Sequence, residues 1–191
     1  MSVEFENDII KCLDVLKNGG TILYPTDTVW GIGCDATNAE AVKKVYELKQ
    51  RDDRKSMIIL VGDEKDILKH VAAPDLAVFD FLGKQTKPTT VIFEGAIGLP
   101  GNLIADDGSI AIRIVKDDFC RHLVKRFRKP IVSTSANISG DETPKLFSQI
   151  DPQIKKAVDH VVAWRQNDET IALPSQIIKW KKDGSFDVIR K

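Results

Sequence analysis

The apolar residues of this chain form two kinds of pattern, one with helical spacing and one of short continuous runs. Ile9, Leu13 and Leu16 recur at helical spacing, and the glycines at 19 and 20 then end that pattern, as they do at the C-terminus of many helices. The run 21–24 follows directly and is typical of a buried strand. The pattern therefore predicts a helix that leads straight into a strand.

The same alternation continues to the end of the chain. Strands are expected at 57–61, 90–93, 110–115, 174–180 and 186–190 and again after Pro130, and helices at about 37–49, 63–70, 75–84, 117–127 and 151–163. Strands that alternate with helices indicate an α/β fold, and the short connections near the middle allow antiparallel neighbours. We therefore expect a mixed sheet whose faces are covered by helices.

Polar residues mark the beginnings of two of these helices. Thr37, followed three residues later by Glu40, resembles a capping box. Asp117 and Asp118 precede the helix that ends before Pro130.

Size and charge narrow the class of protein. A chain of 191 residues with 42% hydrophobic content can bury one core, so residues 1–191 are predicted to form one domain. The 28 Lys and Arg residues balance the 28 Asp and Glu residues. No overall field therefore draws the protein onto nucleic acid or an anionic membrane, and any such contact needs a local patch.

The cysteines and the N-terminus indicate in which cellular compartment the protein is expected. Cys12, Cys34 and Cys120 lie in apolar stretches without CxxC spacing, which favours buried thiols in a reducing cytosol over a disulfide framework or a zinc site. The acidic, amphipathic N-terminus lacks the basic start and apolar run of a signal peptide, and no segment approaches the length of a membrane span. We expect a soluble, cytoplasmic protein with no membrane partner.

Four polar clusters follow the ends of the predicted elements. They are Thr26 to Thr28, the trio Lys49, Arg51 and Lys55, the pair Ser109 and Arg113, and the segment STSANISG at 133–140. In open α/β sheets, polar loops beyond the strand ends are where ligands collect. Lys49 and Arg51 also suit the C-terminal end of a helix, where the dipole favours cations, so either interpretation fits them.

Arg113 is the most informative of these residues. In SIAIRIV both faces of the predicted strand are apolar, which leaves this guanidinium as the one charge in a buried setting. A buried guanidinium is costly unless it meets a carboxylate or phosphate. An acidic residue of the chain would serve, but a ligand carboxylate is the preferred hypothesis, because the planar fork suits bidentate capture.

Several common catalytic signatures are missing from the sequence. It contains no Walker A motif, GxGxxG fingerprint, GxSxG elbow or HExxH helix, and its three histidines lie in predicted helices away from the clusters. The hydroxyl-rich segments, with Asn137 and Gly140, suit a cradle for a phosphate or an amino acid. Asp27 fits two roles equally, capping of its turn or orientation of hydroxyls or a metal-bound water.

The segments YPTDTVWGIGCDA, KQRDDRKSM, AIRIV and PIVSTSANISGDETP, in this order and spacing, resemble the YrdC family of threonylcarbamoyl-AMP synthases. The resemblance covers almost the whole chain. It implies a twisted, mixed α/β sheet flanked by helices, with a concave cavity lined by positive charge. It also implies that L-threonine, bicarbonate and ATP become threonylcarbamoyl-AMP and pyrophosphate, for N6-threonylcarbamoyladenosine at position 37 of tRNA.

The resemblance also assigns individual residues. It implies threonine contacts from Thr28, Arg113, Ser133 and Ser175, ATP contacts from Arg51, Lys55, Ser109, Ser135, Asn137, Thr143 and Arg190, and phosphate stabilisation during catalysis by Lys49, Arg51 and Lys55. No residue is an obvious covalent nucleophile, so catalysis would rest on juxtaposed reactants and on Mg²⁺ carried with ATP rather than held by a protein metal site. Transferase proteins that complete the tRNA modification would be downstream partners.

A second hypothesis is a binding module similar to YciO-like paralogues, which holds RNA or a nucleotide without making the adenylate. Its support is RHLVKRFRK at 121–129, where Arg121, Lys125 and Arg128 fall on one side of a helix and could follow the phosphates of tRNA or another RNA. A solvated helix face accounts for these charges equally well.

Overall fold

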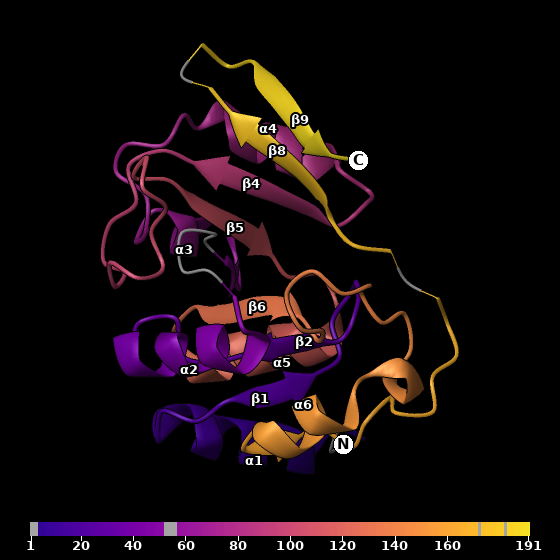
Figure 1. Cartoon of the computed structure of the whole chain (residues 1–191). Coiled ribbons are helices and arrows are strands. Elements are labelled where there is room, and N and C mark those ends of the chain that lie inside the picture. The colour runs from indigo at the N-terminus through magenta and orange to yellow at the C-terminus, as the bar shows by residue number, and fades with distance from the viewer. Residues whose placement is uncertain (1–3, 52–56, 172, 182) are drawn as a thin grey trace.

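One nine-stranded sheet runs through the structure, a computed structural model that describes residues 4–51, 57–171, 173–181 and 183–191 (Figure 1). The strand order is β7-β1-β2-β6-β3-β5-β4-β8-β9. In chain order the strands are β1 (Ile22–Tyr24), β2 (Gly31–Gly33), β3 (Ile58–Val61), β4 (Thr89–Phe93), β5 (Ile110–Ile114), β6 (Ile131–Ser135), β7 (His160–Val161), β8 (Gln176–Trp180) and β9 (Phe186–Arg190).

The sheet mixes the two strand directions, as the short connections predicted. The pairs β1–β7, β3–β5 and β4–β8 are parallel, and the remaining pairs are antiparallel. The expected fold class, a mixed α/β sheet flanked by helices, is confirmed.

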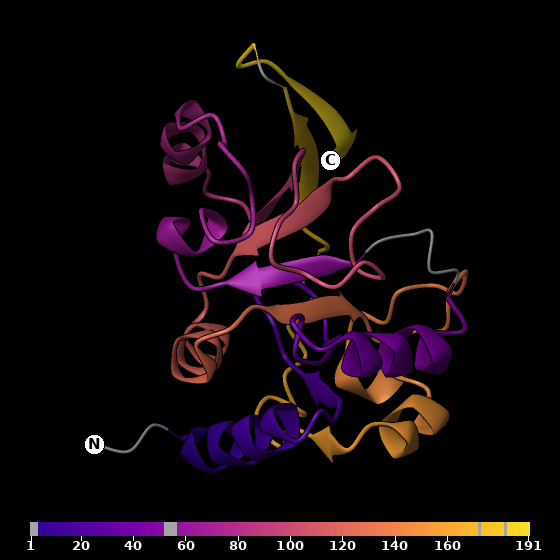
Figure 2. The same ribbon diagram turned by 90° about the vertical axis from the view of Figure 1, so that its left-hand side faces the viewer.

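Helices cover both faces of this sheet. They are α1 (Glu6–Lys17), α2 (Ala39–Lys49), α3 (Glu64–Ile67), α4 (Ala77–Lys84), α5 (Asp118–Phe127) and α6 (Pro152–Ala157), with a 3₁₀ turn η1 at Phe147–Gln149. Figure 2 shows α1, α3, α4 and α5 on one face, and α2, η1 and α6 on the other. The second face is the one on which the candidate site lies.

Two local predictions about these helices were wrong. The N-cap of α2 is Asn38 rather than Thr37, because the Asn38 side chain accepts from the backbone N–H groups of Glu40 and Ala41 while the Thr37 hydroxyl donates to Asp35. The last helix ends at Ala157, and His160 begins a strand that pairs with β1. Asp117, in contrast, caps α5 as expected, since its side chain accepts from the backbone N–H of Cys120.

Strand β2 was not predicted, because Gly-Ile-Gly lacks an apolar run. Its glycines are instead required by close packing against neighbouring residues. A Cβ atom on Gly33 would lie 2.6 Å from the carbonyl oxygen of Val132 on the neighbouring strand β6 and 2.7 Å from the Tyr24 ring. Close approach of these strands therefore requires a residue without a side chain at position 33.

The cysteines lie in the core, as expected: Cys12, Cys34 and Cys120 are buried and form no disulfide with one another. Within the described ranges, no helix is long and apolar enough to cross a bilayer.

We expect Gly33→Ala to destabilise the protein by about 1–3 kcal/mol, because the new methyl group must push apart two paired strands. The matched control is Gly83→Ala in α4, where an added Cβ meets nothing within 4 Å. That substitution should stabilise the protein by up to about 1 kcal/mol through helix propensity. Urea unfolding measures both, and equal stability of the two variants would contradict the packing argument.

Candidate functional site

The register of six neighbouring strands, from β2 to β8 in the sheet order, brings predicted polar residues onto one face of the sheet. Gly31 pairs with Ser135, and Ile58 lies between Ser133 on one side and Ala111 on the other. Side chains alternate along each strand, so Ser133 and Ser135 share a face, as do Ala111 and Arg113. Strands β4 and β8 extend this face through Ile92 and Ile177.

A cavity of about 270 Å³ lies over this face. Eight of the predicted site residues line it: Thr28, Arg51, Arg113, Ser133, Ser135, Thr143, Ser175 and Arg190. Its lining, as far as the chain is described, includes these three arginines and no Asp or Glu. The cavity is therefore suited to ligands that carry negative charge.

Thr26 and Thr28 form a small hydrogen-bonded turn at the cavity wall. The Thr26 hydroxyl donates to the carbonyl of Val29 at 2.8 Å and accepts from the backbone N–H of Thr28 at 3.0 Å. Since Thr26 has a single hydroxyl proton, Thr28 must donate in the 2.9 Å contact between the two hydroxyls. The lone pairs of Thr28 are then left to accept hydrogen bonds from a ligand.

Arg113 meets an acidic residue of its own chain. Its Nη2 lies 3.2 Å from Oδ1 of Asp27, and both side chains are buried, with exposed fractions of 4% and 10%. The preference for a ligand as the counter-ion therefore needs correction, because the turn that carries Thr28 also supplies a carboxylate. Arg113 nevertheless lines the cavity, so a ligand can reach it from the other side.

Lys49 contacts the backbone instead of lining the cavity. Its ammonium group donates to the carbonyl oxygens of Ser135 and Asn137, the latter at 2.6 Å, and only 1% of the residue is exposed. Burial, with a smaller effect of nearby Arg51, lowers the pKa of Lys49 from 10.5 to about 8. This lysine thus ties the end of α2 to the loop after β6.

Asn137 also holds that loop. Its side-chain NH₂ group donates to the carbonyls of Ile138 and Asp141 at 2.9 and 3.0 Å. The loop continues to Thr143, which does reach the cavity. Lys49 and Asn137 thus do not line the cavity themselves, but their hydrogen bonds hold the loop that reaches it.

The C-terminal hairpin closes the far side of the cavity. Arg190 donates from Nε and Nη2 to the carbonyl of Ser175 at 3.0 and 2.8 Å, and the Ser175 hydroxyl lies 2.8 Å from that of Thr90. Residues more than a hundred positions apart, such as Thr28 and Arg190, therefore line the same cavity.

The remaining predicted residues lie elsewhere. Ser109 is buried next to Asp107, whose carboxylate accepts its backbone N–H at 3.1 Å, and it does not line the cavity. Lys55 lies outside the described residues. For all of these residues, the assignment to threonine, to ATP or to catalysis stays a prediction.

Sequence reasoning missed the apolar walls of the cavity, which include Trp30, Ile58, Ile92, Ile177 and Ile189. Trp30 is held by Phe147, whose ring centroid lies 4.7 Å away. The alternation of β3, β4 and β8 could have indicated three of these residues, but only after the register was known. No local sequence pattern indicated the pairing of Asp27 with Arg113.

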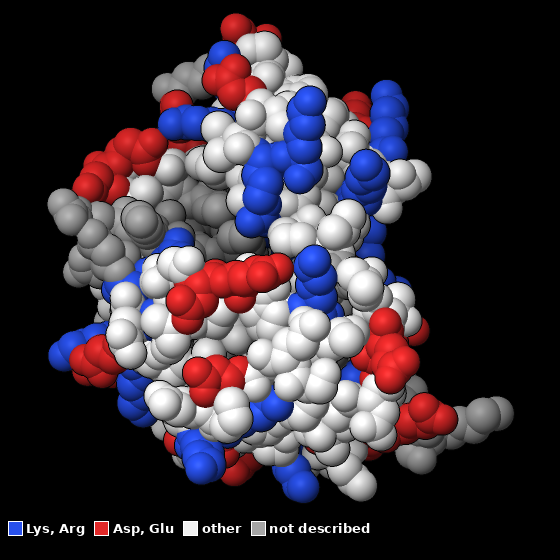
Figure 3. Space-filling model, turned by 45° about the vertical axis from the view of Figure 1, so that its right-hand side comes forward, with Lys and Arg blue, Asp and Glu red and all other residues white. Residues whose placement is uncertain are grey.

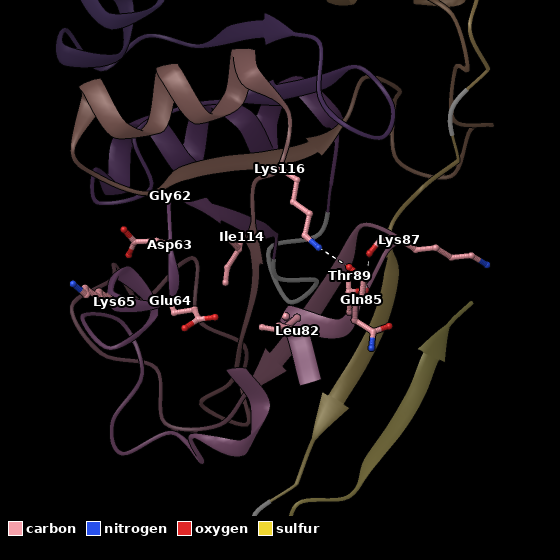
Figure 4. Close-up of a pocket in the computed structure, with 11 residues that line it drawn as sticks. Gly62, Asp63, Glu64, Lys65, Leu82, Gln85, Lys87, Thr89, Ile114 and Lys116 are labelled. Atoms are coloured by element: carbon pink, nitrogen blue, oxygen red, sulfur yellow. Dashed lines mark hydrogen bonds between the residues drawn. The ribbon is translucent and has the colours of Figure 1, made fainter. Parts of the chain in front are cut away.

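A second, larger hollow of about 440 Å³ lies on the opposite face, between α3, α4 and the ends of β3 and β5. Leu82 and Ile114 form its apolar part, Lys116 donates to the carbonyl of Gln85 at 2.6 Å, and Lys87 extends away from it (Figure 4). Its charged residues are exposed, and no residue singled out as a candidate for ligand binding lines it. The smaller cavity is therefore the candidate site.

Figure 3 shows Lys and Arg side chains interspersed with Asp and Glu on the face that it displays. This mixture agrees with the balanced composition. The positive charge of the candidate site is thus local to the cavity.

Fold and site together define an α/β protein with an arginine- and hydroxyl-lined cavity for small anionic ligands. The chain belongs to the Sua5/YciO/YrdC family, whose model, described as "Telomere recombination", matches residues 14–191. A Methanocaldococcus jannaschii protein, provisionally named a threonylcarbamoyl-AMP synthase, is 36% identical over 187 residues, which are 96% of this chain and 87% of that protein. The threonylcarbamoyl-AMP synthase of Idiomarina loihiensis is 32% identical over 164 residues, 83% of this chain and 86% of its own.

A solved structure gives the same fold. P. abyssi Sua5 in complex with L-threonine superposes with a TM-score of 0.79 at 19% identity, over 94% of this chain and 52% of that chain. The chain thus spans about half the length of that protein. At this identity the likeness bears on the fold alone, and it supports the YrdC-like architecture expected from the sequence.

The lowered pKa of Lys49 predicts how stability depends on pH. Between about pH 8 and 10 the unfolded chain still binds the proton that Lys49 has lost in the folded protein, so the contribution of this lysine to the free energy of unfolding should rise, by up to about 1.4 kcal/mol per pH unit. The three buried cysteines, whose pKa values burial raises, contribute in the opposite direction. Lys49→Met should remove the contribution of the lysine, so the difference in stability between the two proteins should change with pH. Urea unfolding at several pH values measures it.

Lys44→Met is the matched control, because Lys44 also lies on α2 and donates to a backbone carbonyl, that of Gly19, but is exposed. Its pH profile should follow that of the unmodified protein. A Lys49→Met profile parallel to both would contradict the buried-ammonium account.

Proposed function

We propose that this protein is a threonylcarbamoyl-AMP synthase, a nucleotidyltransferase that makes threonylcarbamoyl-adenylate and pyrophosphate from L-threonine, bicarbonate and ATP. The observation that carries the proposal is the cavity, in which three arginines and a set of hydroxyls converge without any acidic group among the described residues. Relatives at 32% and 36% identity whose names state this activity support it.

One end of the cavity suits threonine. Arg113 offers a guanidinium to the amino acid's carboxylate, and Thr28 offers an acceptor to its amine or hydroxyl. Ser133 and Ser175 complete this end, and the apolar wall formed by Ile92 and Ile177 provides a place for the methyl group.

Another part of the cavity suits the nucleotide. Arg51, Ser135 and Thr143 line the cavity near the end of α2 and the loop after β6. Arg190 also lines it and donates to the carbonyl of Ser175, so its predicted ATP contact would lie next to the residues predicted to bind threonine. ATP is larger than the enclosed space and would extend from its mouth. Ser109, Asn137 and Lys55 stay predictions as further ATP contacts.

Mg²⁺ would enter with ATP. No group of three His, Cys, Asp or Glu side chains that could hold a metal ion gathers in the described parts of the chain, and the described cavity lining has no carboxylate. This donor set fits an ion held by phosphate oxygens. The ion would supply charge neutralisation on the phosphates, while Arg51 would hold their remaining charge.

The chemistry needs positioning more than a nucleophilic side chain. The neutral amine of threonine combines with bicarbonate to give a carbamate and water. A carbamate oxygen then attacks the α-phosphorus of ATP, and the bond to the β-phosphate oxygen breaks to release pyrophosphate. The cavity would place these reactants together and oppose the charge that develops on the phosphate. The product would then pass to partners that modify tRNA in the cytoplasm.

The alternative, an RNA- or nucleotide-binding module, rests on Arg121, Lys125 and Arg128. In the structure Arg121 pairs with Asp118 of its own helix at 3.8 Å. Asp63 and Asp66 share with Lys125 and Arg128 a hollow on that side of the molecule. These acidic neighbours weaken the case for a phosphate-binding helix face, and the names of the relatives favour the enzyme.

A direct assay tests the proposal. Pyrophosphate release from ATP should require L-threonine and bicarbonate together, because neither compound alone supplies the carbamate. Mass spectrometry should detect threonylcarbamoyl-AMP in the same mixture. Equal pyrophosphate release with ATP alone, or a clear preference for another amino acid, would refute this function.

Substitutions should separate the two parts of the cavity. We expect Arg113→Ala to weaken threonine use by roughly 2–5 kcal/mol while the KM for ATP changes little, and Arg51→Ala to do the reverse. Arg113→Lys should not restore threonine use, since an ammonium cannot reproduce the planar fork. Steady-state kinetics with each substrate varied in turn measures this.

Arg126→Ala is the control for loss of an arginine, because Arg126 pairs with Glu6 at 2.7 Å and does not line the cavity. Its kinetics should match those of the unmodified enzyme. If folded Arg113→Ala protein bound threonine undiminished, the role of this arginine would be structural.

A further inference from the structure

We propose that Asp27 is a positioning residue for threonine, which holds the guanidinium of Arg113 from behind so that its free edge faces the cavity. The inference rests on the proposed function. The inference goes beyond that function because Asp27 itself does not line the cavity and would touch neither substrate.

The contacts of Arg113 distinguish its edges. Nε and Nη2 are enclosed without a hydrogen-bond partner, and Nη2 lies 3.2 Å from Oδ1 of Asp27. Among the described residues nothing bonds to Nη1, and this nitrogen is not enclosed, so it is the one open to the cavity that Arg113 lines. The guanidinium is thus held on one side and available on the other.

Asp27 has no other partner in the described structure. Both of its carboxylate oxygens are enclosed and accept no hydrogen bond. Arg113 is the cation in direct contact with this enclosed carboxylate, and the guanidinium without its anion would be left uncompensated. Each group therefore fixes the position of the other.

The hydrogen-bonded turn at 26–29 explains how the adjacent residues Asp27 and Thr28 can have different roles. Hydrogen bonds from the Thr26 hydroxyl to Val29 and from Thr28 to Thr26 fix the backbone on both sides of Asp27. Thr28 then lines the cavity, while Asp27 contacts Arg113 and does not line the cavity itself. The same turn would thus contact threonine directly and orient the arginine that binds its carboxylate.

The surroundings of Asp27 make the pair sensitive to pH. Burial raises the pKa of Asp27, and the Arg113 guanidinium opposes that rise. Asp117, at the start of α5, raises it further, and Lys116 lowers it. Among the described residues, the charged and titratable groups around the pair are Lys116, Asp117, Cys120 and Tyr24, together with Arg190 of β9, whose charge acts on Arg113.

Protonation of Asp27 would remove the anion that holds Arg113. Because burial raises the pKa of this carboxyl, protonation begins at a higher pH than for an exposed aspartate. The carboxylate of threonine stays ionised to about pH 4 or lower. Threonine affinity should therefore fall as the pH is lowered through the pKa of Asp27.

The test is threonine binding by isothermal titration calorimetry, without ATP, to the full chain and to Asp27→Asn. The amide keeps the shape of the carboxylate but not its charge. We expect threonine binding to weaken by about tenfold or more, while ATP binding, measured separately, stays the same. The unmodified protein should lose threonine affinity on acidification, and Asp27→Asn should not.

Asp35→Asn is the matched control. Asp35 is also buried and also pairs with a cation, Lys129 at 2.7 Å, but it lies outside the cavity lining. This variant should lose stability, because the buried carboxylate that accepts from Lys129 and Thr37 is replaced, and it should keep the threonine affinity and pH profile of the unmodified protein. If Asp27 had only a structural role, Asp27→Asn would give the same result as Asp35→Asn.

The outcomes are separable. Unchanged threonine binding in Asp27→Asn would overturn the positioning role, and tighter binding would overturn it too, by showing that Asp27 competes with threonine for Arg113. If Asp27→Asn does not fold, a threonine affinity of the unmodified protein that is independent of pH would have the same effect. Failure of the unmodified protein to bind threonine would instead refute the proposed function, and this inference with it.

Discussion

The burial of a guanidinium inside the sheet is the constraint around which the candidate site is arranged. Arg113 stands on β5, between Leu60 of the parallel strand β3 and the antiparallel strand β4, with only 4% of its surface exposed. A charge in that position needs an anion. The turn after β1 supplies Asp27, and the same turn places Thr28 at the cavity wall. One electrostatic requirement thus links a central strand, a turn from the other half of the sheet and the cavity between them.

Lys49 meets the same physical problem in another way. It is even more enclosed than Arg113, yet carbonyl oxygens of Ser135 and Asn137 surround its ammonium group instead of a carboxylate. The backbone N–H of Ser139 in turn donates to the carbonyl of Lys49 at 2.8 Å. These bonds join the end of α2 to the loop that carries Thr143 to the cavity. The two buried cations therefore support the site in different ways, Arg113 directly at the cavity and Lys49 through the backbone.

Much of the fold follows from local patterns, and the errors have identifiable causes. The strands at 57–61, 110–115 and 186–190 were predictable because apolar and β-branched residues make up most of each segment of strand length. The strand at 31–33 was not, because contact with β6 selects its glycines. The helix predicted to run to residue 163 ends at Ala157, because pairing of His160 and Val161 with β1 satisfies the backbone that a helix would otherwise have satisfied. In each case a tertiary contact outweighed a local preference.

The sequence by itself determined the fold class, the placement of hydroxyls and cations at strand ends, and the unusual charge of Arg113, since these depend on residue type and short spacing. Only the tertiary structure decided which of those residues share a cavity, because strand register sets which side chains face the same way. It also decided that Lys49 and Ser109 lie outside the cavity lining and that Asp27 is the partner of Arg113. Residues 27 and 113 are far apart in the chain, and a contact of that kind arises from the packing of the whole sheet rather than from any local pattern.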